Sequence, residues 1–240
     1  MKRLLGAVQF LTILPVRGST AAPGASAVWF PLVGAAVGAS AGMVLLAARQ
    51  ALPPGVAAGL ALAWLILITG GLHEDGLADV ADALRAGRTR ARMLEILKDS
   101  RIGAHGALAL LLSVGLRWQA ISSLAVHPVA ALAAAAALSR AALIAVAFWT
   151  EPAGDGLGRG FRASLTAPAT GFAFLQGVAA AMLCGPRAAA WLLALALVVA
   201  AAARAYFTRR LGGVTGDCLG AVCQVCETGF LLVLTCPYCI

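Results

Sequence analysis

Seven stretches of the chain are almost purely apolar, and short polar segments separate them. These stretches are residues 28–48, 52–72, 102–126, 129–149, 171–183, 188–207 and 219–235. Most approach the roughly 20 residues that a helix needs to cross a bilayer. Because unpaired backbone groups cannot face lipid, each stretch is predicted to be a helix. The fifth is short and the third contains Arg117, so we expect six to seven transmembrane helices in an all-α, polytopic integral membrane bundle.

The first 17 residues form a separate segment. An apolar run at 4–14 follows Lys2 and Arg3 but is too short to cross a membrane, and no small-residue cleavage site follows it. We therefore expect residues 1–17 to be amphipathic or re-entrant, with both ends on one side. No polar stretch is long enough for a soluble domain, so residues 1–240 are predicted to form one membrane-embedded domain.

The composition excludes several classes of protein. The chain is 61% hydrophobic and only 12% charged, against about 25% charged residues in a typical soluble domain. Disorder and a soluble enzyme with a polar shell are excluded. The net charge of +8 does not indicate nucleic acid, because the chain has only two Lys and its Arg residues lie scattered between apolar runs. Lipid is the expected surrounding, and the oligomeric state stays open, a homo-oligomer included.

The charges predict the orientation. With the N-terminus in the cytoplasm, cytoplasmic segments (Arg17 among them) hold about fourteen Lys and Arg and the opposite face two, as the positive-inside rule requires. Nine of the ten acidic residues lie at or near the same face: Glu74, Asp75, Asp79, Asp82, Glu95, Asp99, Glu151, Asp155 and Asp217. We expect a bacterial inner-membrane protein with its chemistry on the cytoplasmic side.

The strongest candidate for chemistry is an acidic stripe within residues 70–103. Asp75, Asp79 and Asp82 stand at i, i+4 and i+7, on one face of a helix within an arc of about 60°. Carboxylates so close repel unless a cation lies between them, and Mg²⁺ takes such oxygens together with substrate phosphate and water. A solvated helix face is the alternative, but such a face usually has Lys or Arg between its carboxylates, and here the first Arg after the stripe begins is Arg85. His73 adjoins the stripe as a candidate base or ligand.

Basic residues follow the stripe. We expect Lys98, Asp99 and Arg101 to have a functional role beside the metal site. An anionic diphosphate needs basic contacts, and Arg gives bidentate contacts and Lys a point charge. Three other arginines are interpreted as ordinary basicity of a cytoplasmic loop: Arg88, Arg90 and Arg92.

Two further features point to an anion. Arg140 lies within an apolar stretch, where its charge is costly without an anion or a carboxylate as partner. For Arg117, a snorkelling and a functional position are equally open. The Gly-rich turn at 212–220 precedes a predicted helix, and its backbone amides, including that of Gly213, are expected to hold a phosphate. Asp217 in this turn is a further candidate metal ligand.

The cysteines do not favour a metal site. Cys223-x-x-Cys226 and Cys236-x-x-Cys239 are only nine residues apart, against roughly 15–20 in a zinc ribbon. A local disulfide between Cys236 and Cys239 is favoured over zinc or redox catalysis. His105 and His127 are interpreted as ordinary helix-end residues.

Several motifs together resemble one family. The motifs Gly-Gly-Leu-His-x-Asp-Gly-Leu-Ala-Asp-x-x-Asp (70–82), Arg-Met-Leu-Glu-Ile-x-Lys-Asp-Ser-Arg-Ile-Gly (92–103) and Gly-Gly-x-Thr-Gly-Asp-x-Leu-Gly-Ala (212–221) resemble those of the cobalamin synthase family, the adenosylcobinamide-GDP ribazoletransferases. Residues 10–16, 30–34, 139–140 and 156–158 fit as well.

This resemblance implies a Mg²⁺-dependent transfer in the last stage of cobalamin biosynthesis. α-Ribazole or its 5′-phosphate attacks the cobinamide-side phosphate of adenosylcobinamide-GDP, and GMP leaves. The implied catalytic residues are His73, Asp82, Lys98 and Arg101. The implied substrate contacts are Lys98, Asp99, Ser100, Arg101, Arg140, Gly213, Thr215, Asp217 and Glu227.

Departures and alternatives remain. Glu74 stands where the family usually has an apolar residue, Gln224 where a Glu is common, and the Cys-rich tail is not a family feature.

A cation-coupled transporter would need carboxylates in mid-span and an inverted repeat, whereas only Glu227 lies within a span. A CDP-alcohol phosphotransferase acting on lipid would carry Asp-Gly-x-x-Ala-Arg, whereas Asp75-Gly-Leu-Ala is followed by Asp79.

Overall fold

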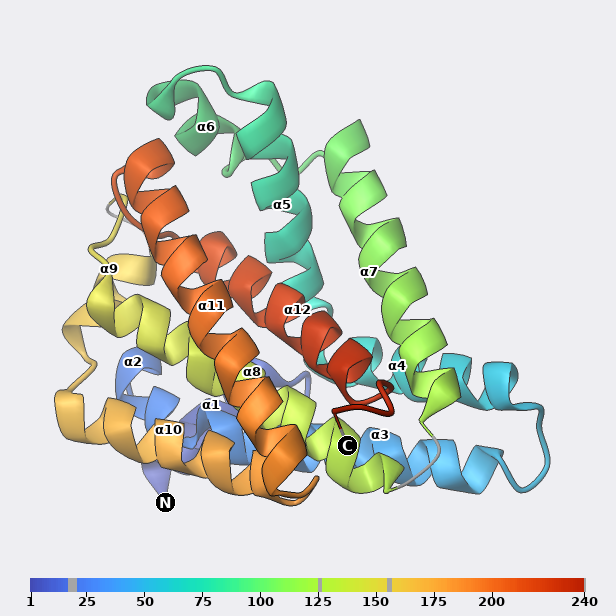
Figure 1. Cartoon of the computed structure of the whole chain (residues 1–240). Helices are drawn as coiled ribbons and strands as arrows, with labels where there is room; N and C mark the ends of the chain where they lie inside the picture. Colours follow the sequence, from blue (N-terminus) through green and yellow to red (C-terminus); the bar gives the residue numbers. More distant parts are fainter. Residues whose placement is uncertain (17–20, 125–126, 155–156, 240) are drawn as a thin grey trace.

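The computed structural model describes residues 1–16, 21–124, 127–154 and 157–239, and the regular structure in these ranges is helical (Figure 1). Its elements are α1 (Lys2–Leu11), α2 (Pro23–Ser26), the 3-10 turn η1 (Ala27–Trp29), α3 (Phe30–Ala48), α4 (Pro54–Thr69), α5 (Leu72–Ala86), α6 (Arg90–Ile96), α7 (Ala104–Ser123), α8 (Pro128–Trp149), α9 (Leu157–Ala163), α10 (Ala167–Met182), α11 (Pro186–Leu211) and α12 (Gly216–Val233). The predicted all-helical class is confirmed. Arg17 and Asp155, which the sequence places on the cytoplasmic side, lie outside the described residues.

Several helices are long and apolar enough to cross a membrane. Within the described ranges there are four, Pro23–Ala48, Pro128–Trp149, Pro186–Leu211 and Gly216–Val233, or five if α4 and α5 form one bent span. The chain is therefore a multi-pass membrane protein. The expected number of six to seven transmembrane helices is slightly higher than this count. The difference lies in α7, which carries Arg117, and in α10, which has 16 residues.

Helix α8 lies at the centre of the bundle, and nearly nine tenths of it is buried. Helix α3 packs along it (Figure 1). The glycines at 34, 38 and 42 all face the α8 backbone. A Cβ atom at Gly34 or Gly38 would collide with the carbonyl oxygen of Ala136 or Leu132. The predicted close packing through four-residue glycine spacing is confirmed.

The predicted apolar stretch 52–72 is broken by two glycines. Gly70 and Gly71 have φ angles of 63° and 69°, a left-handed conformation that glycine adopts without steric cost. Helix α4 ends before them, and α5 starts after them at an angle of 87°. The acidic stripe thus leaves the direction of α4 and packs against α7 and α12 (Figure 1).

The N-terminal segment forms the short helix α1, as expected for an amphipathic element. Gly6, Ala7 and Leu11 are buried on one of its faces, and Lys2 and Arg3 are exposed. Because α1 packs against α2 and α3, its aromatic residue Phe10 stacks on the buried ring of Phe30 while staying partly exposed.

Candidate active site

The two acid-bearing helices, α5 and α12, cross in close contact. A Cβ atom on Gly76 would lie 2.8 Å from the carbonyl oxygen of Asp217 and 3.2 Å from Cα of Gly220. Only glycine therefore permits this approach. The crossing brings Asp75 from α5 and Asp217 from α12 to the wall of one pocket.

This pocket, here called the α5–α12 pocket, has a volume of about 190 Å³. Segments far apart in sequence contribute to it, including α1, α3, α8 and α9. Its lining residues are Phe10, Leu11, Pro23, Phe30, Leu72, His73, Asp75, Leu143, Gly158, Phe161, Gly216, Asp217, Leu219 and Gly220. The wall is apolar except where His73 and the two carboxylates reach it.

Two more carboxylates, Asp79 and Asp82 of α5, lie near those of Asp75 and Asp217. The charges of Asp75, Asp217 and Asp82 all act on the carboxyl of Asp79. In the described part of the chain, the side chains of Asp75 and Asp79 have no hydrogen bond or ion pair, and Asp217 accepts one hydrogen bond of 3.3 Å from the hydroxyl of Thr215. Unpaired carboxylates held together suit a hard divalent cation.

The carboxylates do not enclose a metal by themselves. Within the described ranges, no three His, Cys, Asp or Glu side chains converge closely enough to hold an ion. Mg²⁺ often takes only one or two protein carboxylates and completes its shell with phosphate and water. The donor set therefore fits Mg²⁺ bound together with a phosphorylated substrate, and the metal stays a prediction.

Asp82 has a structural role that the sequence did not reveal. Its carboxylate accepts hydrogen bonds from the amides of Gly103 (2.7 Å) and Gly106 (2.9 Å), at the N-terminus of α7. A side chain at either glycine would collide with this carboxylate. Asp82 thus caps α7 and ties the basic loop before it to α5.

That basic loop, residues 97–103, lies at the surface between α6 and α7. Lys98, Ser100 and Arg101 are exposed. The guanidinium of Arg101 pairs with Asp99 at 2.6 Å, and its hydrogen bonds lower the pKa of Asp99 to about 2. Because Asp82 anchors Gly103, the loop ends beside the acidic stripe. Its expected phosphate contacts stay a prediction.

The interpretation of Arg90 as ordinary loop basicity is wrong. Its Nε donates to the carbonyl oxygen of Leu211 at 2.7 Å, and its Nη2 donates to that of Ala153 at 3.2 Å. Arg90 therefore fastens α6 to the end of α11. Arg88 is exposed, and Arg92 forms a surface pair with Glu95, which agrees with ordinary loop basicity for these two.

The Gly-rich turn before α12 differs from the expected phosphate cradle. The amides of Gly212, Gly213 and Val214 donate to the carbonyl oxygens of Thr208, Phe207 and Glu151. The expectation that the Gly213 amide holds a phosphate is therefore corrected. Gly213 is needed because a side chain would collide with the carbonyl of Glu151. Thr215 caps α12 through its hydroxyl, and the first turn of α12 reaches the pocket at Gly216.

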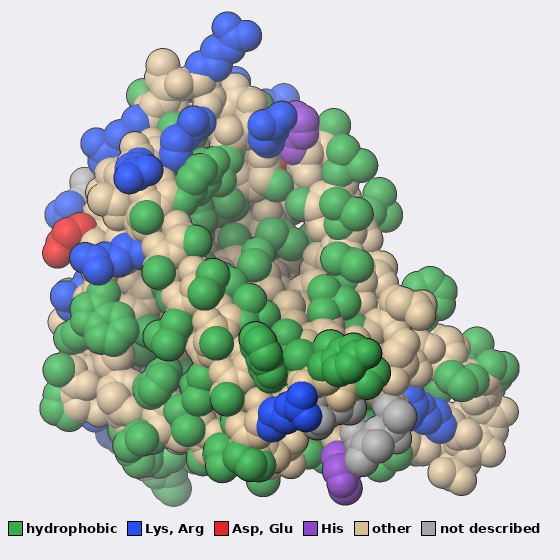
Figure 2. Space-filling view, viewed as in Figure 1, with side chains coloured by type: hydrophobic (Ala, Val, Ile, Leu, Met, Phe, Trp, Pro, Cys, Tyr) green, Lys and Arg blue, Asp and Glu red, His purple; other side chains and the backbone are tan. Residues whose placement is uncertain are grey.

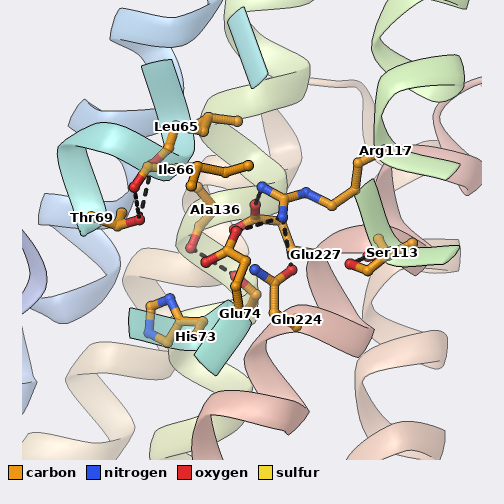
Figure 3. A network of polar contacts seen from close by, with 12 residues as sticks. Leu65, Ile66, Thr69, His73, Glu74, Ser113, Arg117, Ala136, Gln224 and Glu227 are labelled. Atoms are coloured by element: carbon orange, nitrogen blue, oxygen red, sulfur yellow. Dashed lines mark hydrogen bonds and ion pairs between the residues drawn. The ribbon is translucent and has the colours of Figure 1, made fainter. Parts of the chain in front are cut away.

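A buried network of charges lies beneath the pocket (Figure 3). Arg140 is ion-paired with Glu227, and its Nη2 lies 3.3 Å from Nδ1 of His73. Arg140 therefore has the carboxylate partner that its position requires, within the chain. Its expected contact with substrate, and that of Glu227, stay predictions.

Arg117 forms the other half of this network and does not snorkel. Its side chain is 1% exposed, and its Nη1 donates to Glu74 (2.7 Å) and to Gln224 (3.0 Å). Its Nη2 lies 3.1 Å from Glu227. The negative charges of Glu74 and Glu227 are therefore balanced by the positive charges of Arg117 and Arg140.

This arrangement also constrains His73. A guanidinium can only donate hydrogen bonds, so the Nδ1 atom that faces Arg140 must be the acceptor. The neutral ring then carries its proton on Nε2. His73 can offer that proton to a substrate oxygen, but it has no free lone pair, which disfavours the expected role as general base.

The remaining candidates lie away from the pocket. Cys236 and Cys239 are free thiols, not the expected disulfide, and the backbone amide of Cys239 donates to the carbonyl oxygen of Cys236 at 2.9 Å. Cys223 and Cys226 are buried in α12. His105 is exposed in the first turn of α7, and His127 precedes α8, as helix-end residues do.

Comparison with known proteins agrees with the motifs. The family model described as cobalamin-5-phosphate synthase matches residues 3–235. The chain is 45% identical to the adenosylcobinamide-GDP ribazoletransferase of Bradyrhizobium diazoefficiens, over 95% of this chain and 90% of the relative. It is 41% identical to the protein of that name from Klebsiella pneumoniae, over 87% of each. No solved structure matches the chain. The chain belongs to the cobalamin-5-phosphate synthase family.

Proposed function

We propose that this protein joins adenosylcobinamide-GDP to α-ribazole or its 5′-phosphate and releases GMP, as an adenosylcobinamide-GDP ribazoletransferase. The observation that carries the proposal is the meeting of Asp75 and Asp217 on one pocket wall, where α5 and α12 cross. The relatives' names give the substrates, and the motifs of these two helices match the family. The transporter and the lipid phosphotransferase have no comparable support.

In the proposed reaction a ribose hydroxyl oxygen bonds to the cobinamide-side phosphorus, and the bond from that phosphorus to the GMP oxygen breaks. Asp75, Asp79 and Asp217 are the residues that would hold Mg²⁺, which supplies positive charge to the phosphate oxygens and to the leaving GMP. One oxygen of Asp75 would accept the hydroxyl proton, because this carboxylate has no hydrogen bond or ion pair within the described residues and its other oxygen stays available to the metal. His73 offers its Nε2 proton as a hydrogen bond.

The basic loop supplies further positive charge. Lys98 and Arg101 are exposed, and the loop that carries them ends beside the acidic stripe, where the amide of Gly103 donates to Asp82. Charge that develops in a transition state is stabilised best by donors already in place. We propose that these two side chains bind the phosphates of adenosylcobinamide-GDP.

The distribution of charge supports an orientation. Figure 2 shows Lys and Arg gathered over the end of the molecule that carries α6 and the end of α11, with apolar side chains over most of the remaining face. In membrane proteins, the cytoplasmic segments carry an excess of Lys and Arg. We therefore place the pocket on the cytoplasmic side of the bacterial inner membrane.

The direct test incubates the purified protein, in detergent or vesicles, with adenosylcobinamide-GDP and α-ribazole, and measures GMP and the joined corrinoid. We expect GMP release to require both substrates and to stop when EDTA removes the divalent metal. Restoration by Mg²⁺ supports the metal assignment. Turnover that is insensitive to chelation contradicts the metal assignment, and an absence of GMP contradicts the function.

A second test concerns the loop. Lys98→Ala and Arg101→Ala should each lower turnover about 10²-fold, as the loss of one transition-state donor does. Arg88→Ala is the matched control, since Arg88 is also exposed and makes no ion pair within the described residues. Equal losses in all three variants would indicate bulk charge and not specific contacts.

A further inference from the structure

Three aromatic rings from distant segments line the α5–α12 pocket. Phe10 of α1 stacks on Phe30 of α3, with ring centroids 5.3 Å apart and planes inclined by 14°. Phe30 in turn lies 5.9 Å from Phe161 of α9, with planes inclined by 38°. The three rings form a continuous aromatic wall in the pocket that Asp75 and Asp217 also line.

The proposed transfer of a phosphate group has no use for this wall. Carboxylates, a metal and basic side chains are sufficient for the chemistry at phosphorus. Yet the motifs at 10–16, 30–34 and 156–158 each contribute a lining residue, namely Phe10, Phe30 and Gly158. Three separate segments therefore converge on an apolar surface beside the carboxylates, which indicates a ligand with an apolar part and a reacting part.

The size of the pocket limits what that apolar part is. Its volume is about 190 Å³, and a dry apolar cavity of about 150 Å³ is sufficient to bind benzene. A fused two-ring aromatic base therefore fits, whereas a corrin macrocycle does not.

The polarity of the pocket limits it further. Among the lining residues, only His73, Asp75 and Asp217 carry polar side chains. A base with several donors and acceptors at its edge, such as guanine, would be buried with unpaired polar groups, which is costly. An uncharged base with few polar atoms, such as a benzimidazole joined to ribose, leaves only one ring nitrogen to be paired and gains an aromatic contact with Phe10.

We propose that the α5–α12 pocket binds the uncharged fused aromatic base of the nucleoside acceptor. The base packs against the exposed ring of Phe10, which is held in place by the buried ring of Phe30 and, next to it, that of Phe161. Its ribose hydroxyl is thereby held beside Asp75 and Asp217. This inference rests on the proposed function and assigns the acceptor to one subsite of it. Phe30 is 1% exposed and fixed by packing, whereas Phe10 is 38% exposed and lies at the edge of the wall.

The test separates the two substrates kinetically. Phe10→Ala should raise KM for α-ribazole about 10-fold or more, within the range that loss of a base-stacking aromatic ring produces. KM for adenosylcobinamide-GDP should stay unchanged. Phe174→Ala is the matched control, because Phe174 is 37% exposed and does not line the pocket. If Phe10→Ala fails to fold, Phe161→Leu, which keeps an apolar side chain, should show the same rise.

The outcomes are distinct. Wild-type protein that releases no GMP refutes the proposed function, and this inference with it. Active wild-type protein whose Phe10→Ala and Phe161→Leu variants keep an unchanged KM for α-ribazole, or raise KM for adenosylcobinamide-GDP instead, overturns the inference alone. If Phe10→Ala keeps an unchanged KM for α-ribazole and loses lipid that co-purifies with the wild type, the pocket binds an acyl chain. That result would also overturn the inference.

Discussion

Moving one negative charge from α5 to α12 tests whether the buried network is held by overall charge balance. Nη1 of Arg117 donates to the carboxylate of Glu74 at 2.7 Å and to the amide oxygen of Gln224 at 3.0 Å. Either position can therefore place a carboxylate against this guanidinium. The perturbation consists of Glu74→Gln, Gln224→Glu and the two together.

The magnitude follows from burial. The side chains of Arg117 and Glu74 are 1% and 11% exposed, so water screens this pair little. Glu74→Gln leaves two guanidinium groups against one carboxylate, and removal of one partner from a buried pair costs about 3–5 kcal/mol. Gln224→Glu alone adds an unbalanced negative charge. In the double variant the charges balance again, and we expect a net cost of about 1 kcal/mol, since the contact is kept with altered geometry.

The assay is thermal unfolding in one detergent, alongside GMP release. For a chain of this size, 3–5 kcal/mol corresponds to a fall in Tm on the order of 10 °C. Glu74→Gln should show this fall, and the double variant should recover most of it. Glu95→Gln is the control, because its pair with Arg92 is at the surface and contributes about 0–1 kcal/mol. A double variant whose loss equals the sum of the single losses would refute the reasoning.

Three further predictions follow from the contacts of the site. Asp75→Asn and Asp79→Asn should each lower GMP release at least about 10²-fold without lowering Tm, because they remove charge and not packing; near-normal turnover in both would contradict the metal assignment. Asp82→Asn should instead lower stability by about 1–2 kcal/mol, since Asp82 caps α7, and an unchanged Tm would contradict that role. Arg90→Ala should lower Tm through the lost bonds to Leu211 and Ala153, whereas Arg88→Ala should not; equal Tm values would contradict the difference.

The sequence by itself determined the class of the protein and the place of its chemistry. Long apolar runs are local features, and lipid leaves them no alternative to the helix. The acidic stripe at 75–82 and the glycines at 34, 38 and 42 have helical spacing, so each face was predictable, and the structure confirms the glycine packing. The family was also evident in the motifs.

Only the tertiary structure decided what lies opposite each charged side chain. Asp75, Asp79 and Asp82 share a residue type and one face of the helix, yet Asp82 caps a helix that starts 22 positions later, at Ala104. The other two have no hydrogen bond or ion pair within the described residues. Helical periodicity fixes the face on which a residue lies, but not which distant helix packs there.

The buried network shows the same limit. Arg140 finds its partner Glu227 on a helix 87 positions away. Glu74 and Gln224, which in sequence are two separate departures from the family pattern, contact the same guanidinium of Arg117. A charge buried among helices is stable only with a partner. The packing of α5, α7, α8 and α12 decides which charged side chains become partners, and no local pattern in the sequence encodes that packing.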